Sequence, residues 1–179
     1  MRGKTWWARA MKGLAIGLCA MQLAASAVAG TPGEIAVGGQ LPEAQLNALV
    51  GSAAKLSSLR GKPLLINVWA SWCGPCRAEM GSIERLYQRY GKQGFNVIGI
   101  STDDDHAAAA RFVKVSGVSF ANYIDRNLVL ENLLGADRLP LTVLVDDEGR
   151  VIKKMTGSRQ WDSPESINLV TQAFRLKTR

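Results

Sequence analysis

Two apolar runs, Leu64–Ala70 (LLINVWA) and Phe95–Thr102 (FNVIGIST), constrain the fold of this chain more than any other feature. Each run is almost continuously apolar, which is typical of a strand buried on both faces of a sheet. Between the two runs apolar residues recur at helical spacing, and this pattern stops near Gly91 or Gly94. A strand–helix–strand unit of this kind predicts a parallel pair of strands at the centre of an α/β sheet.

The rest of the chain extends this pattern. Asp103–Asp105 open an alanine-rich helix that ends at a glycine, and the acidic residues are expected to cap it. Weaker elements are short strands or turns at 45–50 and 53–59, a strand at 119–124, a short helix at 127–135, a hairpin at 141–157 and a final helix from 164 to about 176. This order predicts a central mixed sheet flanked by helices, with an N-terminal extension and a central insert.

The first 29 residues have the pattern of an export signal. Four basic residues precede an apolar stretch, and Ala27-Val28-Ala29 forms a small-x-small cleavage site. Cleavage there would remove Cys19 and leave a flexible lead-in (30–39) before the folded domain (40–179). The alternative is an uncleaved membrane anchor, because a stretch of about 17 apolar residues is near the lower limit for a spanning helix. Either interpretation places the domain outside the cytoplasm, as a periplasmic protein.

The net charge of +7 does not indicate a nucleic-acid partner. Without the four basic residues of the leading segment, 18 basic residues face 15 acidic ones. No basic stripe remains along the chain, and such a stripe is the sequence signature of nucleic-acid binding.

Cys73 and Cys76 follow the first apolar run directly. A structural zinc site needs four ligands, and the domain offers only these cysteines and His106, so no metal is expected. A stabilising disulfide is possible in an oxidising compartment, yet a domain of about 150 residues buries enough surface to fold without one. A redox couple is the interpretation that the position of the pair favours.

That position is the start of a helix. Unpaired N–H groups and the positive end of the helix dipole stabilise a thiolate there, and the first cysteine gains most. Cys73 is therefore the expected nucleophile and Cys76 the resolving thiol. Gly74 permits close approach of a partner's backbone, and Pro75 suits the first helical turn because no N–H bond is needed there.

Two neighbours of the pair have more than one interpretation. Trp72 directly precedes Cys73 and is expected to border the site, although a tryptophan can also be simple core. Glu79 is three residues beyond Cys76 on the same helix face, where it could exchange a proton with the pair. By spacing alone, a solvated acid near a helix start is the favoured interpretation of Glu79.

The segment WASWCGPCRAEM resembles the active-site segment of thioredoxin-fold proteins. The longer pattern LSSLRGKPLLINVWASWCGPCRAEM, followed later by LPLTVLVDDEGRVI, is similar to the TlpA/ResA-like family of exported thiol–disulfide oxidoreductases. The resemblance covers about Gly38 to the C-terminus. It implies a thioredoxin fold with a central mixed sheet.

The resemblance also implies roles for particular residues. Cys73 and Cys76 match the family's catalytic redox pair, which forms a disulfide in the oxidised state. Pro140 matches a cis-proline that, with Leu139 before it, faces the pair and binds the partner's backbone. Glu79 matches an acid found three residues after the second cysteine, which favours a proton-handling role. Trp72 and the intervening Gly74-Pro75 are expected to contact the substrate.

Two positions depart from related patterns. Asn67 stands where thioredoxin has a buried aspartate, and an asparagine cannot relay protons, so Glu79 becomes the natural substitute. Gly81 stands where relatives often have proline, and only a local effect on the helix is expected.

The function expected from these features is an exported disulfide reductase that acts on protein cysteines, such as those of apocytochrome c. Its partners would be client proteins and a membrane thiol donor, with no cofactor and no nucleic acid, and the chain would act as a monomer. Membrane attachment would require an uncleaved N-terminal segment. The direction of electron flow stays open, since an oxidant differs from a reductant only in potential.

Two alternatives belong to other functional classes. A peroxiredoxin-type enzyme would need the pattern P-x-x-x-T-x-x-C, and neither the proline nor the threonine precedes Cys73. A non-catalytic copper or cytochrome chaperone could use the two thiolates as Cu(I) ligands.

Overall fold

A computed structural model describes residues 32–91 and 94–176. Its strands form one seven-stranded sheet in the order β2-β1-β5-β4-β3-β6-β7. The strands are β1 (Gln45–Ala48), β2 (Ala54–Lys55), β3 (Leu64–Trp69), β4 (Asn96–Ser101), β5 (Ala121–Ile124), β6 (Leu141–Val145) and β7 (Val151–Thr156). The helices are η1 (Leu56–Leu59), α1 (Gly74–Leu86), η2 (Tyr87–Gly91), α3 (His106–Ser116), α4 (Val129–Leu134) and α5 (Pro164–Ala173).

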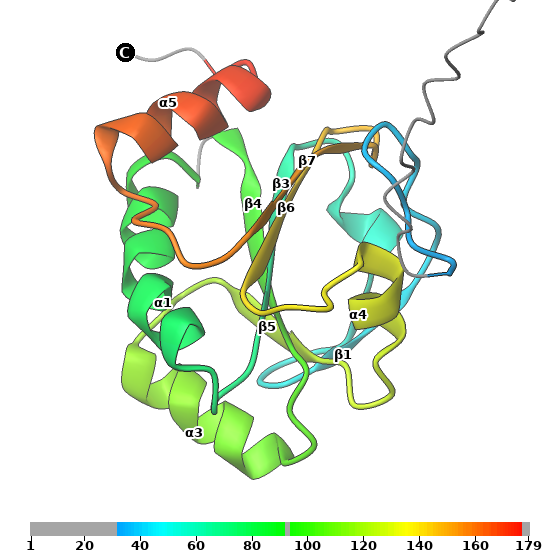
Figure 1. The fold of residues 1–179 in the computed structure, drawn as a ribbon, viewed down its shortest axis with the longest axis vertical. Helices are drawn as coiled ribbons and strands as arrows, with labels where there is room; N and C mark the ends of the chain where they lie inside the picture. Colours follow the sequence, from blue (N-terminus) through cyan, green and yellow to red (C-terminus); the bar gives the residue numbers. More distant parts are fainter. Residues whose placement is uncertain (1–31, 92–93, 177–179) are drawn as a thin grey trace, which may run out of the picture.

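The sheet is mixed. Strands β3, β4 and β5 are parallel, while β6 is antiparallel to β3 and β7 is antiparallel to β6. Helices α1, α3 and α5 cover one face of the sheet, and α4 lies on the other (Figure 1). The predicted α/β thioredoxin-like fold is therefore confirmed.

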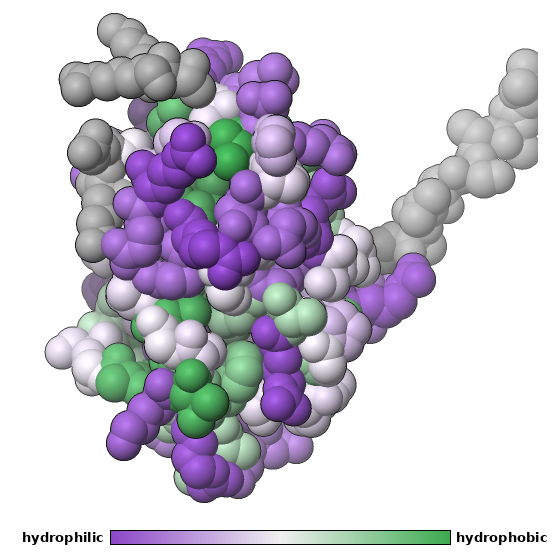
Figure 2. All heavy atoms as spheres, turned by 90° about the vertical axis from the view of Figure 1, so that its left-hand side faces the viewer, coloured by the Kyte–Doolittle hydropathy of each residue, from purple (hydrophilic) through white to green (hydrophobic). Residues whose placement is uncertain are grey.

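Strand β3 is buried along its whole length because both faces of the sheet are covered. Its side chains alternate between two cores: Leu65 and Trp69 pack on the α1 side, and Ile66 and Val68 on the α4 side. The continuous apolar pattern of β3 and β4 follows from this two-sided burial. The outer surface on this side is mostly hydrophilic in its upper half, over α5 and the adjoining part of α1, and it shows more apolar residues in its lower half, where α3 lies (Figures 1 and 2).

The ends of the helices explain several sequence features. Helix α1 is continued by the π-helical turn η2, which ends at Gly91 as the spacing predicted. Asp105 caps α3, accepting a hydrogen bond from the Ala107 N–H at 2.8 Å. Gly117 ends α3 with a left-handed φ of 67°, a conformation that favours glycine. The last helix is shorter than predicted and ends at Ala173.

The segment before the first strand lies against the domain. Ile35 N–H donates to Leu133 O, and Gly38 N–H donates to Val151 O, at 2.9 and 2.8 Å. A flexible lead-in is predicted over 30–39. The part from Ile35 onward is hydrogen-bonded to the domain through its backbone, and Arg150 Nη1 also donates to Gly38 O at 2.9 Å. The predicted export signal (1–29) lies outside the described residues. Within 32–91 and 94–176, no helix is long and apolar enough to span a membrane.

Candidate active site

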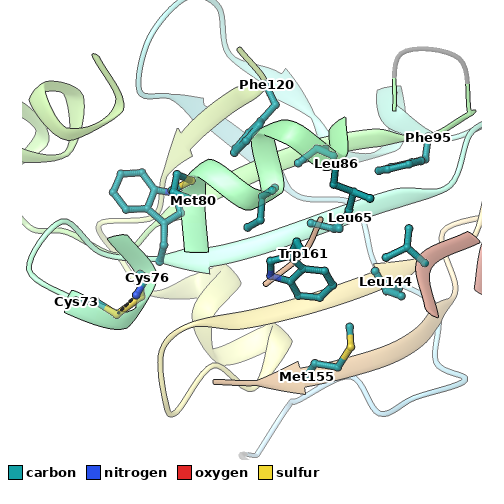
Figure 3. Packing of buried hydrophobic residues seen from close by; sticks show 14 of the residues in the cluster. Leu65, Cys73, Cys76, Met80, Leu86, Phe95, Phe120, Leu144, Met155 and Trp161 are labelled. Atoms are coloured by element: carbon teal, nitrogen blue, oxygen red, sulfur yellow. Dashed lines mark hydrogen bonds between the residues drawn. A yellow bond between two sulfur atoms is a disulfide. The ribbon is translucent and has the colours of Figure 1, made fainter. Parts of the chain in front are cut away.

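The two cysteines lie where β3 gives way to α1. Cys73 is the N-cap of α1, and its Sγ is bonded to Sγ of Cys76, with 5.3 Å between the Cα atoms. The backbone N–H of Cys76 points at Cys73 Sγ, 3.2 Å away. Figure 3 shows the disulfide at one edge of the apolar cluster that fills the α1 side of the sheet. The disulfide therefore lies at the border of the core, and Cys73 is the cysteine that keeps some exposed surface.

The local sequence explains this placement. The Cys73 N–H donates to Ala70 O, and the Arg77 N–H donates to Cys73 O, so the chain turns directly from strand into helix. Pro75 lies in the first helical turn, where its missing N–H costs nothing. Gly74 is exposed, and a Cβ built on it would meet open space. The turn therefore presents an open backbone surface beside Cys73.

The two cysteines differ in exposure. Cys73 retains 5% of its accessible surface, whereas Cys76 retains none. A group that approaches from solvent can therefore reach only Cys73. The N–H groups at the start of α1 also favour negative charge on this sulfur over the buried one.

Trp72 and the Leu139-Pro140 pair lie near this accessible sulfur. Trp72 is 71% exposed, so it is not a core residue. The peptide bond between Leu139 and Pro140 is cis, the isomer that the resemblance implied. Trp72, Cys73 and Leu139 line one groove of about 560 Å³. The structure thus brings together the residues expected to contact a partner, and only Pro140 among them is outside the groove lining.

Glu79 is buried, with 1% of its surface exposed, so its interpretation as a solvated acid is wrong. Its Oε1 accepts a hydrogen bond from Asn67 Nδ2 at 2.8 Å. Its Oε2 accepts from the backbone N–H of Arg159 at 3.0 Å and from Trp161 Nε1 at 3.1 Å. Burial raises the pKa of Glu79 above its ordinary value, and these three donors oppose that shift. The carboxyl is thus an acid held behind the disulfide, one helical turn beyond Cys76.

Asn67 links Glu79 to the centre of the sheet. Its Nδ2 also donates to Thr142 Oγ1 at 3.1 Å, so one amide group joins β3, α1 and β6. Its Oδ1 is buried and has no hydrogen-bond partner among the residues described. The Asn67 amide donates a hydrogen bond to Glu79 and accepts none from it. This favours the ionised form of Glu79, because a carboxylate only accepts hydrogen bonds, whereas a protonated carboxyl also has an O–H to donate.

Asp103 is a site residue that the sequence analysis did not identify. It was expected to cap α3, but only Asp105 does so. Asp103 is 3% exposed, and its carboxylate accepts bonds from Ser71 N–H (2.8 Å), Ser71 Oγ (2.6 Å) and Ser101 Oγ (2.7 Å). The carboxylate at the end of β4 therefore anchors the loop that delivers Trp72 and Cys73. Its position directly after a buried strand, at the same sheet edge as Cys73, was the available signal.

His106 is exposed at the start of α3, as expected. Among residues 32–91 and 94–176, no three His, Cys, Asp or Glu side chains form a group that could hold a metal ion. The chemistry that this arrangement offers is thiol–disulfide exchange, with an accessible sulfur, a buried partner sulfur and a buried acid on one helix.

Comparisons with known proteins agree with this chemistry. The Redoxin family model matches residues 36–170. The chain is 35% identical over 124 residues to the thiol-disulfide oxidoreductase ResA of Geobacillus thermodenitrificans, covering 69% of this chain and 71% of that protein. ResA of Geobacillus kaustophilus is 34% identical over the same shares of both chains.

Solved structures show the same fold. The thioredoxin domain of a thiol-disulfide oxidoreductase from Bacteroides vulgatus has a TM-score of 0.67 and 22% identity, covering 79% of this chain and 99% of that one. A secreted thiol-disulfide isomerase from Corynebacterium glutamicum has a TM-score of 0.65 and 23% identity, covering 76% and 84%. The chain thus belongs to the Redoxin family and is a thioredoxin-fold thiol–disulfide oxidoreductase of the ResA-like group.

Proposed function

We propose that this protein is an exported disulfide reductase, with Cys73 as nucleophile and Cys76 as resolving thiol. The observation that carries the proposal is the unequal placement of the two bonded sulfurs. Cys73 lies at the N-terminus of α1 with some surface exposed, and Cys76 is fully buried one turn later. A couple built this way reacts with a protein partner at one sulfur and resolves the product at the other.

The reaction begins from the reduced pair. The Cys73 thiolate attacks one sulfur of a client disulfide, and the client's other sulfur leaves as a thiolate that takes up a proton. Cys76 then loses its proton and attacks Cys73 Sγ, which breaks the mixed disulfide and releases the second client thiolate. The client gains two electrons and two protons, and the protein is left with the Cys73–Cys76 disulfide seen in the structure.

Glu79 is the proposed acceptor of the Cys76 proton. A buried thiol cannot pass its proton directly to water, and Glu79 is the acid on the same face of α1. Its pKa is raised by burial, which brings it nearer to that of a thiol than an exposed glutamate would be. The donors from Asn67, Arg159 and Trp161 keep the carboxyl in place in both protonation states.

The groove residues Trp72 and Leu139, together with Pro140 directly after Leu139, are proposed to hold the client next to Cys73. Gly74 and Pro75 are proposed to leave space for the backbone of the client. Export is proposed from the pattern of the first 29 residues, which gives a periplasmic location, free or anchored. Apocytochrome c is a proposed client, and a membrane thiol protein is the proposed source of electrons, with the chain acting as a monomer.

The two single-cysteine variants test the mechanism. Cys73→Ser is expected to abolish reduction of insulin disulfides, and Cys76→Ser is expected to accumulate mixed disulfides that a non-reducing gel resolves. Full activity in both variants would contradict the proposal. Tight Cu(I) binding without any disulfide exchange would favour the chaperone alternative instead. The reduction potential of the couple, measured against glutathione, decides whether the protein reduces or oxidises its clients.

A further inference from the structure

The groove beside Cys73 has an unusual distribution of charge. Its volume is about 560 Å³, and Trp72, Leu128, Ala136 and Leu139 supply apolar surface within it. Its charged lining residues are all acidic: Asp104, Glu131 and Asp137. Among the described residues, no lysine, arginine or histidine lines it. This acidic groove occurs on a chain whose basic residues outnumber its acidic ones, 22 to 15.

The three carboxylates also have no ion-pair partner within the described part of the chain. Elsewhere in the described part of the chain, acids form ion pairs, such as Asp162 with Arg85 at 2.6 Å and Glu34 with Lys154 at 2.6 Å. None of the groove acids forms an ion pair with any residue in 32–91 or 94–176. Partial burial and the charge of Asp125 raise the pKa of Glu131, and a hydrogen bond from Thr102 opposes this shift.

The apolar part of the groove is fixed in place rather than loose. Asp125 accepts hydrogen bonds from the N–H groups of Val129 and Glu131, which sets the start of α4. Leu128 precedes α4 with a left-handed φ of 54°, an uncommon conformation for a residue other than glycine, and it is 36% exposed. Trp72 is exposed on the same groove. Apolar contacts of this kind suit the aliphatic stem of a long basic side chain, whose charged end then meets the carboxylates.

We propose that this groove selects client segments that carry lysine or arginine close to the reactive cysteine. The inference rests on the proposed function, because it assigns a substrate class to the same nucleophile. The occupant is an extended segment of a protein, with its sulfur at Cys73 and a basic side chain lying over Trp72 and Leu128. Asp104, Glu131 and Asp137 supply the negative charge that the basic side chain meets.

The test compares three peptide disulfides, in which cysteine is flanked by two lysines, two serines or two glutamates. Each rate of reduction by the protein is divided by the rate with dithiothreitol, which removes the direct effect of flanking charge on the leaving thiol. We expect the normalised kcat/KM to be about tenfold higher for the lysine peptide than for the glutamate peptide at low salt, and to converge at 1 M salt.

The groove variant Asp104→Asn/Asp137→Asn should remove most of this preference, because the normalised rate for the lysine peptide should fall to near that for the serine peptide measured with the same variant. Neither side chain has a hydrogen bond or ion pair within the described residues, so folding should be preserved. The matched control is Asp147→Asn/Glu148→Gln, which removes the same charge at the turn between β6 and β7. That turn is at the far end of the sheet, since Val145 pairs with Leu64 while Leu141 pairs with Val68 beside the active site. The control should keep the full preference.

The same peptides with serine in place of cysteine measure binding without chemistry, through NMR shifts of the Trp72 amide. Equal normalised rates, a preference for glutamate, or a lysine preference that survives in the groove variant would each overturn the proposal. Failure of the proposed function is distinguishable, because all three disulfides would then go unreduced while lysine-dependent binding could still be seen. Absence of lysine-dependent binding would overturn the groove proposal on its own.

Discussion

Two buried carboxylates, Glu79 and Asp103, hold the region around the cysteines, and each accepts three hydrogen bonds. The donors to Asp103 come from Ser71, two residues before Cys73, and from Ser101 at the end of its own strand. The donors to Glu79 come from β3 and from the loop between β7 and α5, which are distant in sequence. Asp103 therefore holds one short loop in place, whereas the carboxyl of Glu79 links segments that are distant in the sequence.

A buried acid can serve the structure of a loop, or it can take part in proton transfer. A carboxylate whose donors belong to a neighbouring loop contributes chiefly to the shape of that loop. A carboxylate on the same helix face as a buried thiol, with a pKa raised by burial, is placed to exchange a proton with it. Replacing each acid should therefore change different measurements.

Glu79→Gln should have the largest effect on activity. The amide cannot take the Cys76 proton, so kcat for disulfide reduction should fall by about 100-fold, within the usual range for losing a general base. KM should change little, because Glu79 does not line the groove. Steady-state insulin reduction over pH 5–9 measures kcat and KM. In the variant, the part of the pH dependence of kcat that comes from ionisation of the Glu79 carboxyl should vanish. A variant with wild-type kcat and an unchanged pH profile would remove Glu79 from the mechanism.

The same substitution should change how stability depends on pH. The pKa of Glu79 is higher in the folded than in the unfolded protein, where it is near 4.5, so the folded state binds the proton more tightly. The contribution of Glu79 to the free energy of unfolding is fully present below its pKa in the unfolded protein. It is lost as pH rises through its pKa in the folded protein. The free energy of unfolding of the wild type, relative to Glu79→Gln, should therefore decline across that window. Urea titrations of both oxidised proteins provide the measurement, and a parallel pair of curves would contradict the expectation.

Asp103→Ala should act mainly on stability and on the placement of the loop. It leaves the Ser71 N–H and two hydroxyls without their acceptor, at a cost of about 3 kcal/mol in the free energy of unfolding. Because Trp72 and Cys73 follow directly, kcat/KM should fall about tenfold, with the pH profile of the wild type retained. Ser71→Ala is the matched control, since it removes one of the three bonds and should cost about 1.5 kcal/mol. A displaced pH profile in Asp103→Ala would show that this acid also takes part in proton transfer.

The fold was more predictable than the partners of these acids. The continuous apolar residues of β3 and β4 predict that both faces of these strands are buried. The position of Cys73 at a helix start is predicted by a strand pattern that is followed directly by a helix pattern. Glu79 had a usable signal, because it shares a helical stripe with Cys76, Ile83 and Leu86, all of which are buried. The solvated interpretation is wrong because this face of α1 is buried, and Glu79 is buried with it.

Other features depend on contacts between distant parts of the chain. The bond from Trp161 to Glu79 joins residues 82 apart, and no local pattern marks either of them as partners. The acceptors of the segment from Ile35 to Gly39 are backbone carbonyls, which every residue possesses. Asp103 differs from Asp105 only in its place relative to the end of β4, and three consecutive aspartates conceal that difference in the sequence.

Asn67→Leu should give the smallest effect, and it addresses how Glu79 is tuned. The leucine has a similar shape, and it removes the unpaired Oδ1 together with the two N–H donors, so the losses and gains in stability partly cancel. Loss of the Asn67 donor leaves the effect of burial less opposed, so the pKa of Glu79 should rise further. The acid limb of the pH–activity profile should move to higher pH with it, and the maximal kcat should be preserved. Thr142→Val is the control, because it removes a neighbour of Asn67 without removing the donor to Glu79. If Asn67→Leu leaves the acid limb in place, then the pKa of Glu79 is set by burial and by the donors from Arg159 and Trp161, and the link from β3 is structural, as it is for Asp103.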